Sequence, residues 1–154
     1  GAIYIIFGRP DWQVFLENQE FVIGKALHLK QGKDVSIFAT GHMVWQALEA
    51  VRILEKEGID CELINIHTIK PLDEEAILNS VKKTNRVVTC EEHQRHGGLG
   101  DSIAQLLVRN HPCPQEYIAV NDSFGESGKP LELLDKYGLS VNDVVNSVRA
   151  VLLR

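Results

Sequence analysis

Cysteine is scarce in this sequence of 154 residues, and its three copies, Cys61, Cys90 and Cys113, lie far apart. No two of them form a CxxC pair, and their odd number excludes a fully paired disulfide framework. Cys61 and Cys90 stand in apolar, strand-like runs, where a free thiol behaves as a small hydrophobic side chain. This usage fits a reducing compartment, so we expect a cytoplasmic protein.

Long apolar runs and clusters of basic residues are also missing. No run reaches the roughly 20 apolar residues that a membrane-spanning helix needs, and no basic-then-apolar leader opens the chain. The net charge is −5, whereas binding a nucleic acid requires a clustered basic face. We therefore expect neither a nucleic-acid partner nor a membrane partner.

What the sequence does contain is a regular succession of elements from Phe21 onward. Strands are predicted at 34–40, 61–66, 86–90 and 115–120, and helices at 43–58, 71–83, 101–110, 131–138 and 140–154. Strands that alternate with helices of ten or more residues are typical of βαβ units and of a mainly parallel sheet covered on both faces. The predicted fold class is α/β, as a three-layer α/β/α sandwich.

The first twenty residues do not fit this succession. Ile3–Phe7 (IYIIF) has the composition of a buried strand, and residues 8–20 have no clear period and are interpreted as a connecting arm. Because the strand pattern follows a single Gly-Ala, we expect a truncated or split polypeptide. Within the arm, Arg9 stands between Gly8 and Pro10, where its guanidinium could hold an anionic ligand.

Ligand sites in an open parallel sheet gather at the carboxyl ends of the strands, where loops meet helix N-termini. Three predicted loops qualify, at residues 40–42, 67–71 and 91–100. The third combines carboxylates, imidazoles and a GGLG turn, with Glu91, Glu92, His93 and His96 in six residues.

Several chemistries could use this third loop. Gly98-Leu99-Gly100 precedes a helix as in a dinucleotide site, but Ile103 replaces the third glycine and the acidic residues would repel a phosphate. His93 and His96 could bind a metal with Glu91 or Glu92, although the spacing matches no established metal motif. The alternative is a structural turn that brings the next helix close to the sheet.

Two further motifs give weaker indications of a catalytic or binding site. Ser102 or Cys90 could act as a nucleophile beside a histidine, but neither stands in a GxSxG elbow or a cysteine-enzyme context. The GESGKP segment is too short for a phosphate-binding P-loop, and its lysine is followed by Pro130 instead of serine or threonine.

The motifs IIFGRP, FVIGKA, DVSIFATG, INIHTIKPLD, VVTCEEH, GGLGDSIA and SFGESGKPLELLDKYGLS, taken in order, cover nearly the whole chain. Together they resemble the carboxyl-terminal part of transketolases, especially the separate carboxyl-terminal subunits of split transketolases. The resemblance implies that residues 1–20 are the last strand of a preceding pyrimidine-binding domain with its connecting arm, and that residues 21–154 are the transketolase C-terminal domain.

The resemblance also implies thiamine-diphosphate chemistry, in which a two-carbon ketol unit moves between sugar phosphates. The cofactor and its divalent metal belong to domains of the complete enzyme that this sequence lacks, so we expect the chain alone to be inactive and to bind neither. No catalytic or metal-binding residue of the family maps onto it. The expected partners are the N-terminal transketolase domains or subunit, within a homodimer.

By the same resemblance, Arg9 matches the arginine that holds the substrate phosphate. Glu91, Glu92, His93 and His96 are interpreted as an interface loop. The rival enzymes are the beta subunit of a pyruvate-dehydrogenase-type decarboxylase and a deoxyxylulose-phosphate synthase, which share this domain. The rival from another class is a binding module that pairs subunits or senses a regulator.

Overall fold

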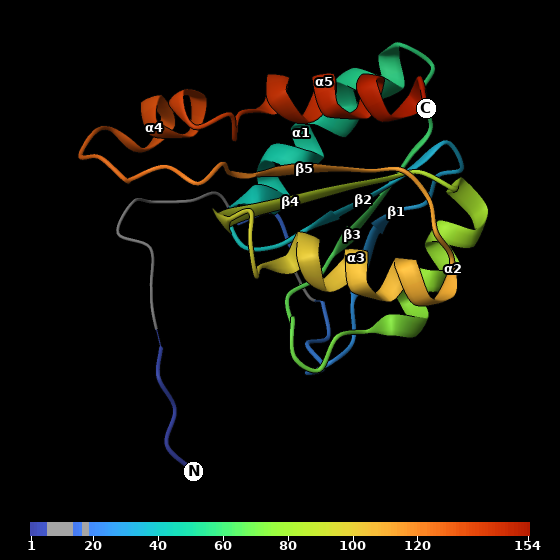
Figure 1. The fold of residues 1–154 in the computed structure, drawn as a ribbon, viewed down its shortest axis with the longest axis horizontal. Coiled ribbons are helices and arrows are strands. Elements are labelled where there is room, and N and C mark those ends of the chain that lie inside the picture. Colours follow the sequence, from blue (N-terminus) through green and yellow to red (C-terminus); the bar gives the residue numbers. More distant parts are fainter. Residues whose placement is uncertain (6–13, 17–18) are drawn as a thin grey trace.

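The computed structural model describes residues 1–5, 14–16 and 19–154, and within them five strands form one sheet. The strands are β1 (Leu27–Lys30), β2 (Val35–Ala39), β3 (Cys61–Asn65), β4 (Val87–Gln94) and β5 (Gln115–Val120). Their order across the sheet is β1-β3-β2-β4-β5, with β1 antiparallel to β3 and the other neighbours parallel (Figure 1). The mainly parallel sheet predicted from the sequence is confirmed.

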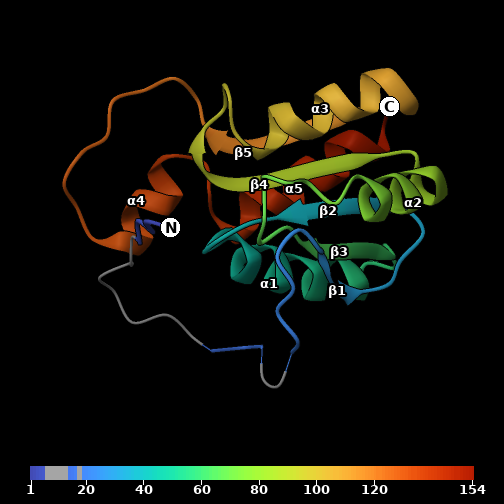
Figure 2. The ribbon, with the colours of Figure 1, turned by 90° about the horizontal axis from the view of Figure 1, so that it is seen from below.

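Helices cover both faces of this sheet. They are α1 (Met43–Lys56), α2 (Glu74–Thr84), α3 (Leu99–Asn110), α4 (Pro130–Lys136) and α5 (Val141–Leu152). One hydrophobic core lies between the sheet and α1 and α5, and the other between the sheet and α2 and α3 (Figure 1 and Figure 2). The chain therefore adopts the predicted three-layer α/β/α sandwich.

The composition of the central strands explains this layering. All five residues of β2 are buried, and neighbours alternate between the two cores: Ile37 packs toward α1 and α5, whereas Phe38 packs toward α2 and α3. The one polar side chain of β2, Ser36, is buried with its hydroxyl within hydrogen-bond distance of Ser80 and Thr84. Successive side chains of a strand point to opposite faces, so a strand that is buried on both faces has no side chains directed to solvent. This is why VSIFA carries no outward polar face.

The helix ends follow from specific caps. α1 is followed by Gly58, whose φ of 81° is the left-handed conformation that suits a helix C-terminus. α2 begins at Glu74, three residues later than Pro71, because the Asp73 side chain accepts a hydrogen bond from the backbone N–H of Ala76. At α5, Ser140 and Asp143 form a capping box.

Three sequence-based expectations about elements were wrong or incomplete. β1 was not predicted; it is a short edge strand that, among the described residues, pairs with β3 alone. β4 does not end at Cys90 but continues to Gln94, because Gln94 pairs with Val120 beyond an irregularity in the register. Ile3, Tyr4 and Ile5 are exposed and belong to no strand, so the predicted IYIIF strand does not form within this chain over these residues; the rest of it lies outside the described residues.

None of the helices in the described part of the chain combines the length and the apolar character that crossing a bilayer requires.

Candidate functional site

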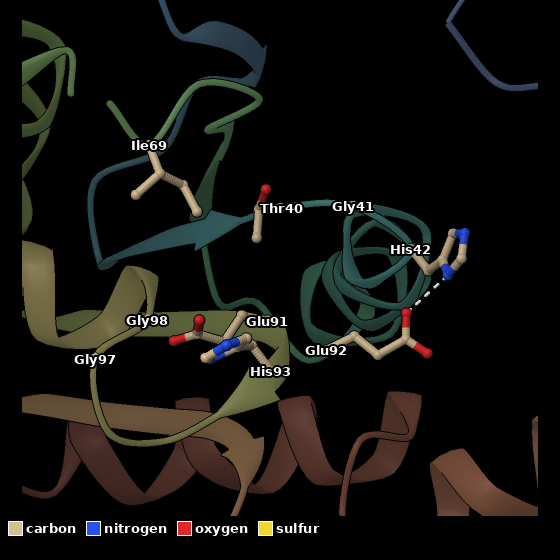
Figure 3. Close-up of a pocket in the computed structure, with 9 residues that line it drawn as sticks. All are labelled: Thr40, Gly41, His42, Ile69, Glu91, Glu92, His93, Gly97 and Gly98. Atoms are coloured by element: carbon tan, nitrogen blue, oxygen red, sulfur yellow. Dashed lines mark hydrogen bonds and ion pairs between the residues drawn. The ribbon is translucent and has the colours of Figure 1, made fainter. Parts of the chain in front are cut away.

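A pocket of about 360 Å³ lies at the carboxyl ends of the central strands, where the sequence predicted a ligand site. The segment after β2 contributes Thr40, Gly41 and His42, and the segment after β3 contributes Ile69. The end of β4 and the turn before α3 supply the rest, namely Glu91, Glu92, His93, Gly97 and Gly98 (Figure 3). The first and third predicted loops therefore meet here, and the second takes part through Ile69.

Glu91 is the buried residue at the base of this pocket. Its relative exposure is 1%, and its carboxylate accepts hydrogen bonds from the backbone N–H of Leu99 at 2.7 Å and of Gly100 at 2.8 Å. These two N–H groups are among those that the first turn of α3 leaves without a partner inside the helix. A negative charge is also favoured there by the helix dipole. Glu91 thus caps α3 from a neighbouring strand.

The glycines of the GGLG turn leave the space that this cap requires. A Cβ atom at Gly98 would lie 1.9 Å from Oε2 of Glu91, and one at Gly100 would lie 2.5 Å from the ring of Tyr117. Gly97 has a φ of +83°, and its N–H donates to the carboxylate of Asp101 at 2.7 Å. The glycines are required for close approach of the helix, as the structural interpretation of the turn predicted.

The same geometry argues against phosphate or dinucleotide binding at this turn. The N–H groups of Leu99 and Gly100, which a phosphate would need, already donate to a carboxylate. A phosphate would have to displace Glu91 and would then lie beside its charge.

The other polar residues of the pocket lie nearer the surface. His42 Nδ1 is 2.7 Å from Oε2 of Glu92, and the two side chains are 33% and 45% exposed. His93 Nδ1 lies 2.9 Å from the backbone carbonyl oxygen of the adjacent residue, Gln94. The pocket therefore combines one imidazole–carboxylate pair with a second imidazole.

Metal and nucleophilic chemistry have little support at this site. Among the described residues, no three side chains of the His, Cys, Asp or Glu types come together as a metal site would require. Cys90 is buried, and its burial, with a smaller effect from Glu91, raises the pKa of the thiol, so the reactive thiolate is disfavoured. Ser102 donates its hydroxyl hydrogen to the carbonyl oxygen of Gly98 at 2.9 Å.

The residues of this pocket do not fit the diphosphate and metal of a thiamine cofactor. A diphosphate needs free N–H donors or cations, whereas the N-terminus of α3 is capped by Glu91, and a divalent metal needs a cluster of oxygen ligands. No catalytic step through that cofactor is therefore assigned to these residues.

The residues predicted from the sequence separate into three groups. Arg9 lies outside the described residues. Glu91 is buried and supports the loop from inside, and its predicted interface role is untested. Glu92, His93 and His96 are exposed, and their interface role stays a prediction. The cap made by Glu91 was missed because a helix cap is normally sought just before the helix, not eight residues upstream on a strand.

Comparison with known proteins gives a consistent result. The family model "Transketolase, C-terminal domain" matches residues 24–144. The 6-deoxy-6-sulfo-D-fructose transketolase subunit SqwH of a Clostridium species is 44% identical over 152 residues, which is 98% of this chain and 47% of that protein. A transketolase C-terminal section of Methanocaldococcus jannaschii is 40% identical over 152 residues, 96% of this chain and 47% of that protein. The chain thus spans about half the length of these relatives.

Among solved structures, one described as "Split gene transketolase, inactive beta4 tetramer" has a TM-score of 0.87 and 44% identity, covering 92% of this chain and 46% of that one. A 1-deoxy-D-xylulose-5-phosphate synthase of Heliobacterium modesticaldum also matches, at 39% identity over 128 residues, 82% of this chain and 20% of that protein.

Proposed function

The chain belongs to the transketolase C-terminal domain family, and we propose that it is the carboxyl-terminal part of a thiamine-diphosphate-dependent transketolase, which transfers a two-carbon ketol unit between sugar phosphates. The observation that carries this proposal is the 44% identity to a transketolase subunit over 98% of the chain. The free, buried thiols of Cys61 and Cys90 support a reducing, cytoplasmic location.

In this proposal the chain contributes assembly and architecture, and a separate N-terminal transketolase section supplies the cofactor, the metal and most of the active site. The capped N-terminus of α3 and the lack of a metal cluster among the described residues support this division. The chain alone is then inactive. The complete enzyme is a homodimer of such pairs.

Two regions of the chain would make functional contacts. Arg9 would bind the phosphate of the sugar substrate through charge-assisted hydrogen bonds. Glu92, His93 and His96 would lie at an interface with the partner section, supported from below by the buried Glu91. Because the related split transketolase structure is described as a beta4 tetramer, we also propose that this chain self-associates when its partner is absent.

Reconstitution tests the main proposal. The chain is mixed with an N-terminal transketolase section, thiamine diphosphate and magnesium, and ketol transfer from xylulose 5-phosphate to ribose 5-phosphate is measured. Activity is expected only in the mixture. Ketol transfer by the chain alone, or tight calorimetric binding of thiamine diphosphate to the chain alone, would contradict the division of roles.

The second candidate is a deoxyxylulose-phosphate synthase, favoured by the 39% identity to one such enzyme. That identity is below the 44% of the transketolase subunit SqwH. The same reconstituted mixture supplied with pyruvate as donor separates the two candidates, since a synthase or a pyruvate decarboxylase would consume pyruvate and a transketolase would not.

A further inference from the structure

β5 is an edge strand whose outer side is open to pairing. The described residues add no strand beyond it, so its outward N–H and C=O groups form a row available to another strand. Proteins often block such edges with charged side chains or proline. β5 has a single charged residue, Glu116, and Arg154 of the same chain already pairs with it at 2.7 Å. Nothing in its sequence opposes pairing with a second strand.

The segment that follows β5, residues 121–129, is a projecting arm. It runs past the end of the sheet before the chain turns back into α4, in both views (Figure 1 and Figure 2). Every residue of the arm is exposed, and Phe124 is 98% exposed. Aromatic side chains are enriched at protein–protein interfaces, so this exposed ring is a candidate contact with a partner.

The arm is held in place by contacts at its base. Tyr137 of α4 donates its hydroxyl hydrogen to the carbonyl oxygen of Phe124 at 2.9 Å, and Gln94 Nε2 donates to the carbonyl oxygen of Ser123 at 3.2 Å. Lys136 pairs with Glu126 at 2.5 Å. These contacts use the backbone and the charges of the arm and leave the ring of Phe124 outward, so the arm is organised before a partner binds.

An apolar hollow of about 240 Å³ lies beside the other end of β5, between its first residues and the last turns of α3. Its lining includes Leu107, Val108, Pro112, Cys113 and Tyr117. Val108 is 73% exposed there, which is high for an aliphatic side chain in a helix. The hollow has the size and chemistry to receive an aromatic ring.

We propose that two copies of this chain dock through β5, edge to edge and antiparallel, with Phe124 of each copy in the hollow of the other. Antiparallel pairing places the end of one β5 beside the start of the other. The arm of one copy then continues next to Pro112 and Cys113 of its partner copy, and the twofold axis makes the two contacts identical. The inference rests on the self-association proposed above.

The length of the arm and the position of the charged residue in β5 are compatible with this arrangement. The four residue steps from Val120 to Phe124 span at most roughly 14 Å, a limit within which the ring can lie past the end of the strand and beside the hollow of the neighbour. When pairing is centred on Tyr117, which then lies opposite its own copy, Glu116 lies opposite Ile118, so no acidic side chains of β5 face each other across the axis.

Sedimentation equilibrium on the chain tests the interface. Phe124→Ala and Val108→Glu are each expected to raise the dissociation constant of the oligomer at least tenfold. The matched controls are Phe21→Ala and Ile23→Glu, at positions that are 66% and 73% exposed and lie before β1, at the opposite edge of the sheet. Circular dichroism confirms that each variant folds.

A cross-link gives a second readout. Phe124→Cys is expected to form a disulfide with Cys113 of the other copy under mild oxidation, giving a covalent dimer on a non-reducing gel that disappears when Cys113→Ser is added. A wild-type chain that stays monomeric, or an oligomer that neither variant weakens, would overturn the proposed interface. Neither result bears on the reconstituted ketol-transfer assay, which tests the proposed function independently.

Discussion

The carboxylate of Glu91 accepts a hydrogen bond from the backbone N–H of Leu99 at 2.7 Å, in a position where Glu91 is 1% exposed. This contact joins the end of a central strand to the start of the next helix. It explains why a charged side chain is buried at the carboxyl edge of the sheet, since a helix N-terminus stabilises it and the carboxylate in turn satisfies N–H groups that would otherwise lack partners.

Removing this carboxylate should destabilise the domain. We expect Glu91→Ala to lower the free energy of unfolding by about 2–4 kcal/mol, because two N–H groups in a buried position lose their acceptor. Urea denaturation followed by circular dichroism measures the change. Glu92→Ala, which removes an exposed carboxylate from the adjacent position, is the control and should cost less than about 1 kcal/mol. Equal losses for the two variants would contradict the capping role.

A side chain at Gly98 should interfere with the same cap. Gly98→Ala would place a Cβ atom 1.9 Å from the Glu91 carboxylate, and we expect a loss of about 1–3 kcal/mol. Gly125→Ala, where the Cβ atom would meet no atom within 4 Å, is the control. Because the clash is with Glu91 itself, the double variant Gly98→Ala/Glu91→Ala should lose less stability than the sum of the single variants. Strict additivity would show that the clash lies elsewhere.

Lys83 should contribute to stability through the buried Glu62. Glu62 is 1% exposed, and it accepts hydrogen bonds from Ser80 Oγ at 2.5 Å and from Lys83 Nζ at 2.8 Å. Lys83→Met removes the nearer basic partner of a buried carboxylate, whose other basic neighbour is His28 at 3.8 Å, and since the lysine is partly exposed we expect a loss of about 1–3 kcal/mol. Thermal unfolding measures it. The neighbouring exposed Lys82→Met should change little, and a similar loss there would point to helix propensity instead.

Stability should fall at alkaline pH because of Cys61. Burial raises the pKa of this thiol from 9.0 to about 12. Above pH 9 the unfolded chain loses the thiol proton while the folded chain keeps it, so the thiol's contribution is complete below pH 9 and is lost as the pH rises toward 12. The contribution changes by about 1.4 kcal/mol per pH unit within that range. Cys61→Ala should show a shallower decline in unfolding free energy between pH 9 and 11; parallel curves would refute the assignment.

Arg9→Ala should act on substrate binding in the reconstituted enzyme. A charge-assisted hydrogen bond is worth about 1.5–3 kcal/mol, so KM for phosphorylated sugars should rise roughly 10- to 150-fold. An unphosphorylated substrate such as hydroxypyruvate should be nearly unaffected, because it has no phosphate for the guanidinium to hold. Arg9→Lys, which keeps the charge but not the two-point geometry, should recover part of the loss. Equal effects on both kinds of substrate would argue against the phosphate contact.

The pocket shows which features of the site could be predicted from the sequence. The three loops at the strand ends could be named in advance, because parallel strands bring their carboxyl ends to one edge. The roles of their residues could not. Glu91 and Glu92 are adjacent in the sequence, yet β4 continues through both, so one points inward to cap α3 and the other outward to His42. Only the alternation of side chains along the strand separates their roles.

The sequence by itself determined the layered α/β architecture. Short apolar runs such as VSIFA, each followed by an amphipathic helix, predict buried strands with covering helices, so the alternation of the two patterns was sufficient. Tertiary structure determined which strands lie at the edges of the sheet and which contacts form there. β1 becomes a strand through pairing with β3, β4 is lengthened by pairing with β5, and Phe124 is left exposed because the arm is held by its backbone and charges. These features depend on residues distant in the chain, which no local pattern records.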